Sequence, residues 1–246
     1  MAWPITHIYI AGQVQDEFFG GYLDEIRYFF SAYDYNWYFW GAIAADFNRF
    51  SDGLMKREET HMLGKNNRCD LFTYDGKIEE EDNANQQRIM NQQVFDYGYR
   101  THLLVDDYLE KNVLLQSDGA KFALDRYIRK KYKANIRKYR WLFLPGTTID
   151  KFSWAQMAHK IEMASGEEIL IEHLINKRYI QKEKAEEMFG AFKKEMSRYI
   201  SNPSIQTGSY NVDQNKIEAF AKEYIKSGKI AKAVINKFIG WDKKKD

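Results

Sequence analysis

The clearest chemical signal in the sequence is a histidine followed four residues later by an aspartate. His102 and Asp106 flank the apolar run 103–105, within a segment of helical periodicity. Side chains four residues apart on a helix lie on one face, one turn from each other. An imidazole nitrogen and a carboxylate oxygen in that arrangement can bind one divalent cation. A buried His–Asp hydrogen bond explains the pair equally well, so this pair alone leaves both interpretations open.

Three more residues with metal-binding side chains precede this pair. His7 stands at the start of a predicted helix, Asp46 closes an apolar segment that we expect to be a buried helix, and His61 lies in a polar region. The chain has five histidines and one cysteine, Cys69, so a thiolate zinc site is excluded. The potential ligands therefore follow the order His, Asp, His and then His-x-x-x-Asp.

This order and its local context resemble the zinc-dependent phospholipase C family. Members of that family carry a Thr-His near the N-terminus, like Thr6-His7, and a Gly-x-Ile-x-x-Asp segment, like 41–46. A histidine follows, as His61 does here. Next comes an aromatic-Gly-aromatic-x-x-His-x-x-x-Asp helix, like 97–106. The resemblance covers residues 5 to about 130, roughly half of the chain.

The resemblance implies an all-α, multi-helix single domain of the phospholipase C and P1 nuclease type. Such proteins hold up to three divalent cations, usually zinc, and hydrolyse a phosphodiester of a phospholipid. By resemblance, one metal is held by Asp46, His61, His102 and Asp106. Asp106 would bridge to a second metal that His7 also binds, and Asp46 would be the candidate general base. We expect one or two ions, with zinc favoured.

The third cation of the family has no matching ligand set here. Glu110 stands one turn after Asp106, where the family has a histidine, and Ser117 and Lys121 stand where a His and a Glu are expected. A protonated lysine cannot ligate a metal. We therefore expect the third site to be lost, with Lys121 outside the ligand set. His159 and His173 could rebuild it, although ordinary surface or partly buried histidines explain these two residues as well.

Length and composition favour one domain over 1–246, with 1–145 as the metal-site half and 146–246 as additional helices. The hydrophobic fraction is 44%, with only three prolines, so long helices are allowed. Helical periodicity predicts helices over 5–30, 36–47, 86–116, 121–141, 152–163, 167–200 and 213–239. We expect a loop-rich region with short helical turns over 51–85 and a turn at 117–119. With no apolar run long enough to span a bilayer, we expect a cytoplasmic protein.

The charge distribution leaves more than one function open. The stretch 126–140 holds eight basic residues and no acidic one, and 216–246 holds nine basic and four acidic. Either stretch could face phosphate or an anionic membrane, or be a solvated helix face. We expect a metal-dependent phosphoesterase acting on a small phosphate ester or a phospholipid head group. The alternatives are an inactive scaffold or binding protein that retains a structural metal, and a nuclease-like hydrolase.

Overall fold

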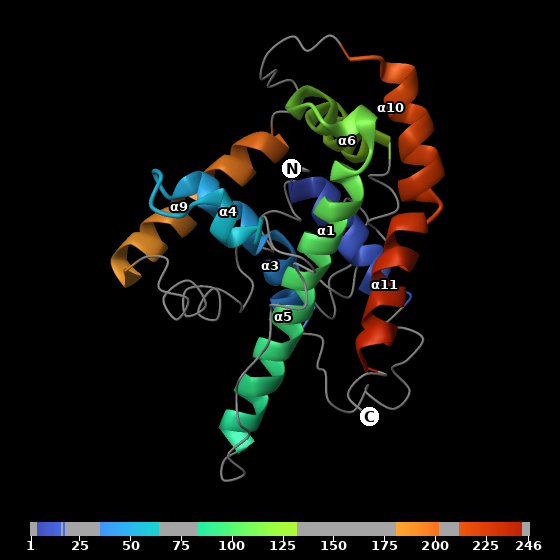
Figure 1. Cartoon of the computed structure of the whole chain (residues 1–246). Coiled ribbons are helices and arrows are strands. Elements are labelled where there is room, and N and C mark those ends of the chain that lie inside the picture. The colour runs from blue at the N-terminus through green and yellow to red at the C-terminus, as the bar shows by residue number, and fades with distance from the viewer. Residues whose placement is uncertain are drawn as a thin grey trace, which may run out of the picture. The chain divides into compact units, whose positions relative to one another are not determined.

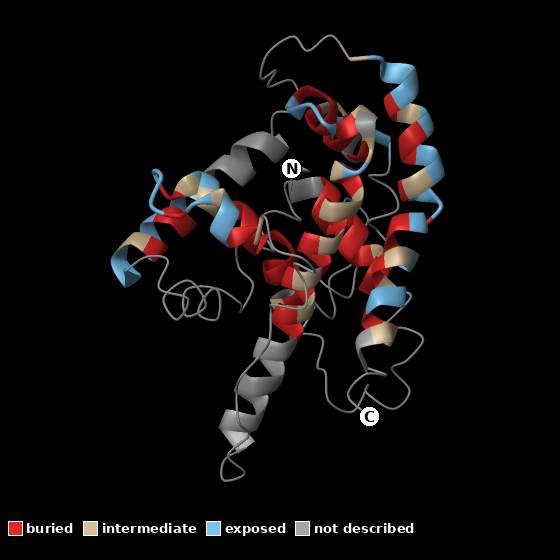
Figure 2. Cartoon of the chain, in the orientation of Figure 1, coloured by how far each residue is buried: buried red, intermediate tan, exposed pale blue. Residues whose placement is uncertain are grey.

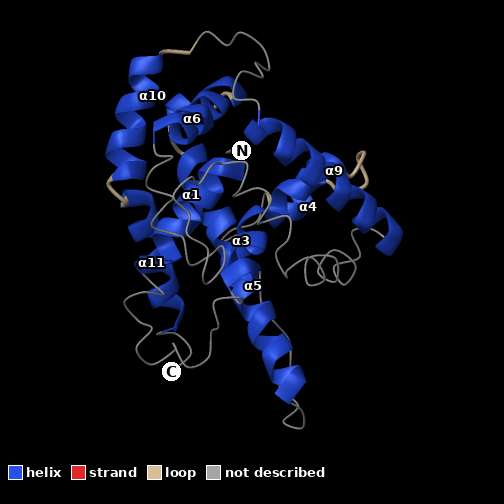
Figure 3. Ribbon diagram, turned by 180° about the vertical axis from the view of Figure 1, so that it is seen from behind, coloured by secondary structure: helices blue, strands red, loops and turns tan. Residues whose placement is uncertain are grey.

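The fold was analysed in a computed structural model, which describes residues 4–15, 17, 35–63, 83–131, 181–201 and 212–242. Over these ranges the chain forms helices and turns, with no strand (Figure 3). The all-α prediction is thereby confirmed for the described residues, while the phospholipase C and P1 nuclease type stays a prediction. None of the described helices is both long and apolar enough to cross a membrane.

The contacts divide the chain into two compact units. Unit 1 comprises Met1–Phe30, Leu104–Arg140 and Ser204–Asp246, and unit 2 comprises Ser31–Leu103 and Trp141–Pro203. Helix α5 (Asn83–Glu110) contributes residues to both units. Its 28 residues correspond to about 42 Å of helix. The prediction of a single domain over 1–246 stays a prediction.

Unit 1 is built around a helix that is buried on almost every side. Helix α1 (Pro4–Val14) begins with proline, whose fixed φ suits the first helical position. Buried residues follow from Thr6 to Gly12 and again at Val14. Helices α6 (Asp118–Lys131) and α11 (Lys229–Asp242) pack against α1. Burial all around α1 explains why its sequence is apolar without an amphipathic period.

The C-terminal part of unit 1 is a run of short helical elements. Asp213 caps α10 (Gln214–Phe220), because its carboxylate accepts from the backbone N–H groups of Asn215 and Lys216. The π-helical turn η5 (Ala221–Lys226) follows directly. Gly228, at φ +74°, then separates η5 from α11. Figure 1 shows α10 and α11 end to end, and Figure 2 shows that each has a buried and an exposed face.

Unit 2 is organised by a very close crossing of two helices, α3 (Tyr35–Ala44) and α5. A Cβ atom added at Gly41 would lie 2.0 Å from the carbonyl oxygen of Phe95. A Cβ atom added at Gly98 would lie 2.0 Å from the carbonyl oxygen of Tyr38. Since neither distance leaves room for a carbon atom, both positions require glycine. The two backbones therefore touch, and this contact fixes the position of α3 along α5.

The rest of unit 2 packs aromatic side chains on this crossing. Helix α9 (Lys182–Ser201) buries Ala185, Met188 and Phe189, which are spaced as one face of a helix. The Phe189 ring stacks on Phe47 at a centroid distance of 5.9 Å and lies 4.9 Å from Trp40. Phe47 belongs to the 3-10 helix η2 (Ala45–Phe50), which continues α3. These contacts between aromatic rings hold η2 in place.

The one-turn helix α4 (Arg57–Thr60) agrees with the short helical turns expected within the loop-rich region. The structure differs from the expected element boundaries in two places. The expected turn at 117–119 is the start of α6, with the Ser117 hydroxyl accepting from the backbone N–H of Ala120. The helix expected over 213–239 is divided at Gly228, because a positive φ ends an α-helix. The expected helix over 152–163 lies outside the described residues, as do the parts 18–30, 132–141 and 167–180 of three other expected helices.

We predict that Gly98→Ala will destabilise the protein by about 3 kcal/mol, the upper end of the usual cost of overpacking, because the new methyl group meets a rigid backbone carbonyl. Gly190→Ala is the matched control, since a Cβ atom at Gly190 in α9 meets nothing within 4 Å. That substitution should stabilise by about 0.5–1 kcal/mol through helix propensity. Urea unfolding measures both. Equal effects of the two substitutions would contradict the close crossing.

Candidate metal centre

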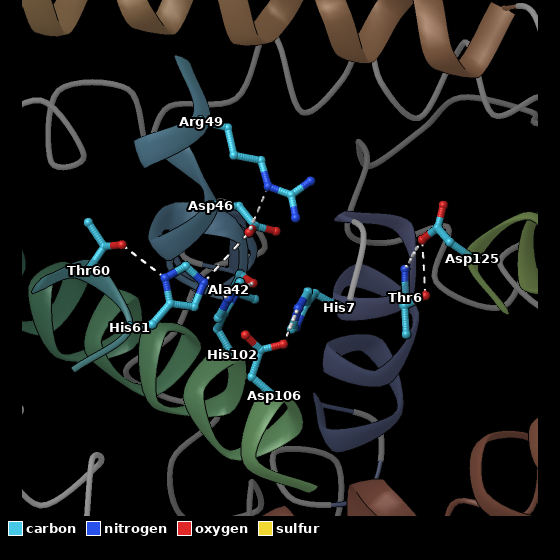
Figure 4. Close-up of polar contacts among 10 residues, drawn as sticks. All are labelled: Thr6, His7, Ala42, Asp46, Arg49, Thr60, His61, His102, Asp106 and Asp125. Carbon is cyan, nitrogen blue, oxygen red and sulfur yellow. Dashed lines mark hydrogen bonds and ion pairs between the residues drawn. The ribbon is translucent and has the colours of Figure 1, made fainter. Parts of the chain in front are cut away.

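Three of the predicted ligands converge within unit 2. Asp46 comes from η2, His61 follows α4, and His102 lies on α5. All three side chains are buried. The Nε2 atoms of the two histidines are 3.4 Å apart, and His61 Nε2 lies 3.7 Å from Asp46 Oδ1 (Figure 4). A ligand atom of His102 and one of Asp46 are also within 4.8 Å of each other. We call Asp46, His61 and His102 the His–His–Asp cluster.

The two imidazoles are oriented through their Nδ1 atoms. His102 Nδ1 lies 2.8 Å from the carbonyl oxygen of Ala42, which can only accept, so Nδ1 carries the proton. His61 Nδ1 lies 2.9 Å from the Thr60 hydroxyl. That hydroxyl donates to the carbonyl oxygen of Arg57, so it accepts from His61 Nδ1–H. In both rings Nε2 is therefore the atom that carries a lone pair, and the two lone pairs face each other.

The backbone around His61 is held by a helix C-cap. The N–H of Leu63 donates to the carbonyl of Glu58, and the N–H of Met62 donates to that of Glu59, which is the Schellman pattern. Met62 has a φ of +51°, a left-handed conformation that glycine usually adopts at this position. For a residue with a side chain this conformation costs roughly 1–2 kcal/mol. This local strain lies directly beside a potential ligand, as strain often does at functional sites.

Helix α5 supplies two further hydrogen bonds that hold the surroundings of the cluster. The Tyr99 hydroxyl donates to the carbonyl oxygen of Thr60 at 2.6 Å and so anchors the end of α4. Thr101 Oγ1 donates to the carbonyl of Tyr97 and accepts from the Tyr38 hydroxyl at 2.9 Å. Burial raises the pKa of Tyr38, which keeps this hydroxyl protonated as a donor. These bonds tie both α3 and α4 to α5.

Two of the distances within the His–His–Asp cluster suit a tetrahedral metal ion. Two ligand atoms at about 2.0–2.1 Å from a tetrahedral zinc are about 3.3–3.4 Å apart. The observed separations, 3.4 Å between the two Nε2 atoms and 3.7 Å between His61 Nε2 and Asp46 Oδ1, lie at or slightly above that value. Two facing lone pairs repel each other unless a cation, either a metal ion or a proton, lies between them. The donor set and its geometry therefore fit a divalent metal.

Unit 1 contains the other two predicted ligands as a buried pair. His7 Nε2 on α1 lies 3.3 Å from Asp106 Oδ1 on α5. Thr6, the residue before His7, is anchored by Asp125 of α6, whose Oδ1 accepts from the Thr6 backbone N–H at 2.7 Å and from its hydroxyl at 3.0 Å. Asp125 thus satisfies a backbone donor in the first turn of α1 and complements the positive end of that helix.

The predicted residues therefore fall into two groups that share one helix. Unit 2 brings together Asp46, His61 and His102, and unit 1 brings together His7 and Asp106. Residues 102 and 106 are one turn apart on α5, as the i, i+4 spacing predicted. That all five residues form one centre stays a prediction.

Several residues that support these groups were not anticipated from the sequence. Arg49 lies three residues after Asp46 and places its Nε 3.5 Å from Asp46 Oδ1. Helical spacing from Asp46 could have identified it. Thr60 and Asp125 gave no comparable signal, because their partners depend on tertiary contacts. Lys121 is buried on α6, and its exclusion from a ligand set stays a prediction. His159 and His173 lie outside the described residues.

No family model, curated protein or solved structure matches this chain. The resemblance to zinc-dependent phospholipases C therefore rests on the motifs alone.

We predict that Thr60→Val will change the tautomer of His61 and leave that of His102 unchanged. Valine has the shape of threonine but cannot accept from His61 Nδ1–H, whereas the acceptor of His102 is a backbone carbonyl. After the proton has moved to Nε2, the buried His61 Nδ1 has lost the hydroxyl group that it faces in the wild type, which should lower the free energy of unfolding by about 1–3 kcal/mol. Long-range ¹H–¹⁵N NMR of the imidazoles distinguishes the tautomers. Wild-type His61 already protonated at Nε2 would contradict the assignment.

Proposed function

We propose that this protein is a divalent-metal-dependent hydrolase of phosphoric esters, with a metal ion held by the His–His–Asp cluster. The observation that carries the proposal is the facing pair of Nε2 atoms, 3.4 Å apart, beside the Asp46 carboxylate. Two imidazoles and one carboxylate are a ligand set of catalytic zinc sites, which keep a further coordination position open. They also suit iron and manganese. His7 and Asp106 remain additional ligands predicted from the resemblance.

A divalent cation would supply Lewis acidity, which lowers the pKa of water and polarises a phosphoryl oxygen. The protein's own contribution starts with Asp46. Its Oδ1 is the oxygen that faces His61 and Arg49, so we assign acceptance of a proton from the attacking water to Oδ2. His61 and His102 are fixed by their Nδ1–H bonds and would hold their Nε2 atoms in place throughout the reaction.

The substrate class follows from the resemblance rather than from the described surface. A small phosphate ester or a phospholipid head group is the proposed substrate, in the cytoplasm. A nuclease-like activity would use the basic stretch 126–140, of which residues 132–140 lie outside the described part of the chain.

One observation favours a second candidate, a non-catalytic protein with a structural metal. Lys121 is buried on α6 at the position where the family has a metal-binding glutamate. An ammonium group cannot replace that ligand. A scaffold that retains one metal needs only the His–His–Asp cluster.

We predict that protein purified without added metal will contain one or two equivalents of a divalent metal. His102→Ala removes a predicted ligand, so it should weaken zinc binding by more than roughly 100-fold, the largest usual cost of losing a residue that only orients a ligand. Glu183→Ala, which removes an exposed carboxylate in the first turn of α9, is the control. Elemental analysis and competition with a chromophoric chelator measure both quantities. An empty wild-type protein that also binds no metal on titration would overturn the proposal.

We predict weak hydrolysis of a generic aryl phosphodiester by the wild-type protein, abolished by Asp46→Asn. The amide keeps the shape of the carboxylate but loses its negative charge and its basicity. Loss of a general base costs about 10²–10⁴ in rate, and weaker metal binding would add to this. Metal content must be measured on the same samples, so that metal loss and base loss are separated. A metal-loaded wild type inactive on lipid, nucleotide and aryl diesters would favour the scaffold function.

A further inference from the structure

Arg49 and the His–His–Asp cluster share one carboxylate oxygen. Arg49 Nε lies 3.5 Å from Asp46 Oδ1, and His61 Nε2 lies 3.7 Å from the same oxygen (Figure 4). Arg49 and Asp46 are three residues apart on η2, so the local helix brings them together. Asp46 is buried, while the Arg49 side chain is 28% exposed. The Arg49 side chain therefore reaches solvent, whereas the carboxylate with which it pairs does not.

A metal ion and this guanidinium would disfavour each other. A cation ligated by Asp46 must approach Oδ1 or its neighbouring oxygen to about 2.0–2.2 Å, within a few ångströms of the arginine. The repulsion between a +1 and a +2 charge about 5 Å apart lowers the affinity for the metal ion more than tenfold, even with the dielectric constant of water. A guanidinium also cannot be deprotonated at physiological pH, so the repulsion cannot be relieved by proton loss.

We propose that Arg49 regulates metal occupancy by competing with the cation for Asp46. Without metal, the ion pair keeps a buried carboxylate neutralised and the cluster ordered. Metal binding displaces Arg49 from Asp46, so the ion binds reversibly instead of being trapped in the fold. This inference rests on the proposed metal site, and it adds that Arg49 limits the affinity of that site for the metal ion.

The test compares Arg49→Gln with Lys184→Gln in the full-length protein. Lys184 also belongs to unit 2, its side chain is also 28% exposed, and it pairs with Asp52 and Glu187 instead of the cluster. Both substitutions remove one positive charge. The affinity for Zn²⁺ is measured by chelator competition, and thermal unfolding is followed on metal-free samples.

Arg49→Gln should bind Zn²⁺ at least about tenfold more tightly than wild type, and its metal-free form should unfold at a lower temperature. Lys184→Gln should stay within about twofold of wild type in affinity. An arginine that merely supports the structure would instead weaken both properties when removed. Unchanged or weaker metal binding by Arg49→Gln overturns the inference.

A measurement on wild-type protein covers the case in which Arg49→Gln fails to fold. Addition of Zn²⁺ should shift the ¹H–¹⁵N resonance of Arg49 Nε–H and speed its exchange with solvent, and an unchanged resonance overturns the inference. Absence of Zn²⁺ binding by both wild type and Arg49→Gln overturns this inference and the proposed function together. Tighter binding by Arg49→Gln without hydrolysis by either protein supports the inference and contradicts only the hydrolase.

Discussion

The backbone contact between α3 and α5 is the constraint on which the rest of unit 2 depends. Gly41 and Gly98 let the two helices approach until main-chain atoms meet. At that distance the carbonyl of Ala42, one residue after Gly41, reaches His102 Nδ1 at 2.8 Å. Helix α3 then continues into η2, which carries Asp46. A wider crossing would separate the imidazole from both groups, so the glycines act on the cluster without touching it.

The His–His–Asp cluster also shows how polar partners reduce the energetic cost of burying a polar group. Each imidazole has its Nδ1–H satisfied by an oxygen atom, and Asp46 is next to a guanidinium. Buried polar groups are costly only when such partners are missing. The same Nδ1–H bonds orient the two rings so that their Nε2 atoms lie 3.4 Å apart, with Asp46 Oδ1 3.7 Å from that of His61. The hydrogen bonds that satisfy the buried imidazoles therefore also position the atoms that would bind a cation.

The sequence predicted those features that depend on local spacing. Residues 102 and 106 were placed on one helix face by the i, i+4 rule, and α5 confirms that placement. The apolar segment ending at Asp46 was expected to be buried, and it is. Features that depend on long-range contacts were missed. No local sequence pattern shows that the Thr60 hydroxyl orients the His61 ring. Nor does any local pattern show that Asp125, 119 residues further along the chain, accepts from Thr6. The left-handed backbone at Met62 was missed as well, because glycine usually marks that position.

The anchoring of Thr6 by Asp125 has a consequence for folding. Helix α1 has only 11 residues, too few for a stable isolated helix in water, and the carboxylate that accepts from its first turn lies far along the chain. During synthesis at about 5–20 residues per second, roughly 6–24 seconds separate the two segments. The largely apolar segment must remain without its partners for that time. His7 likewise cannot reach its native position until the part of α5 that carries Asp106 has been synthesised.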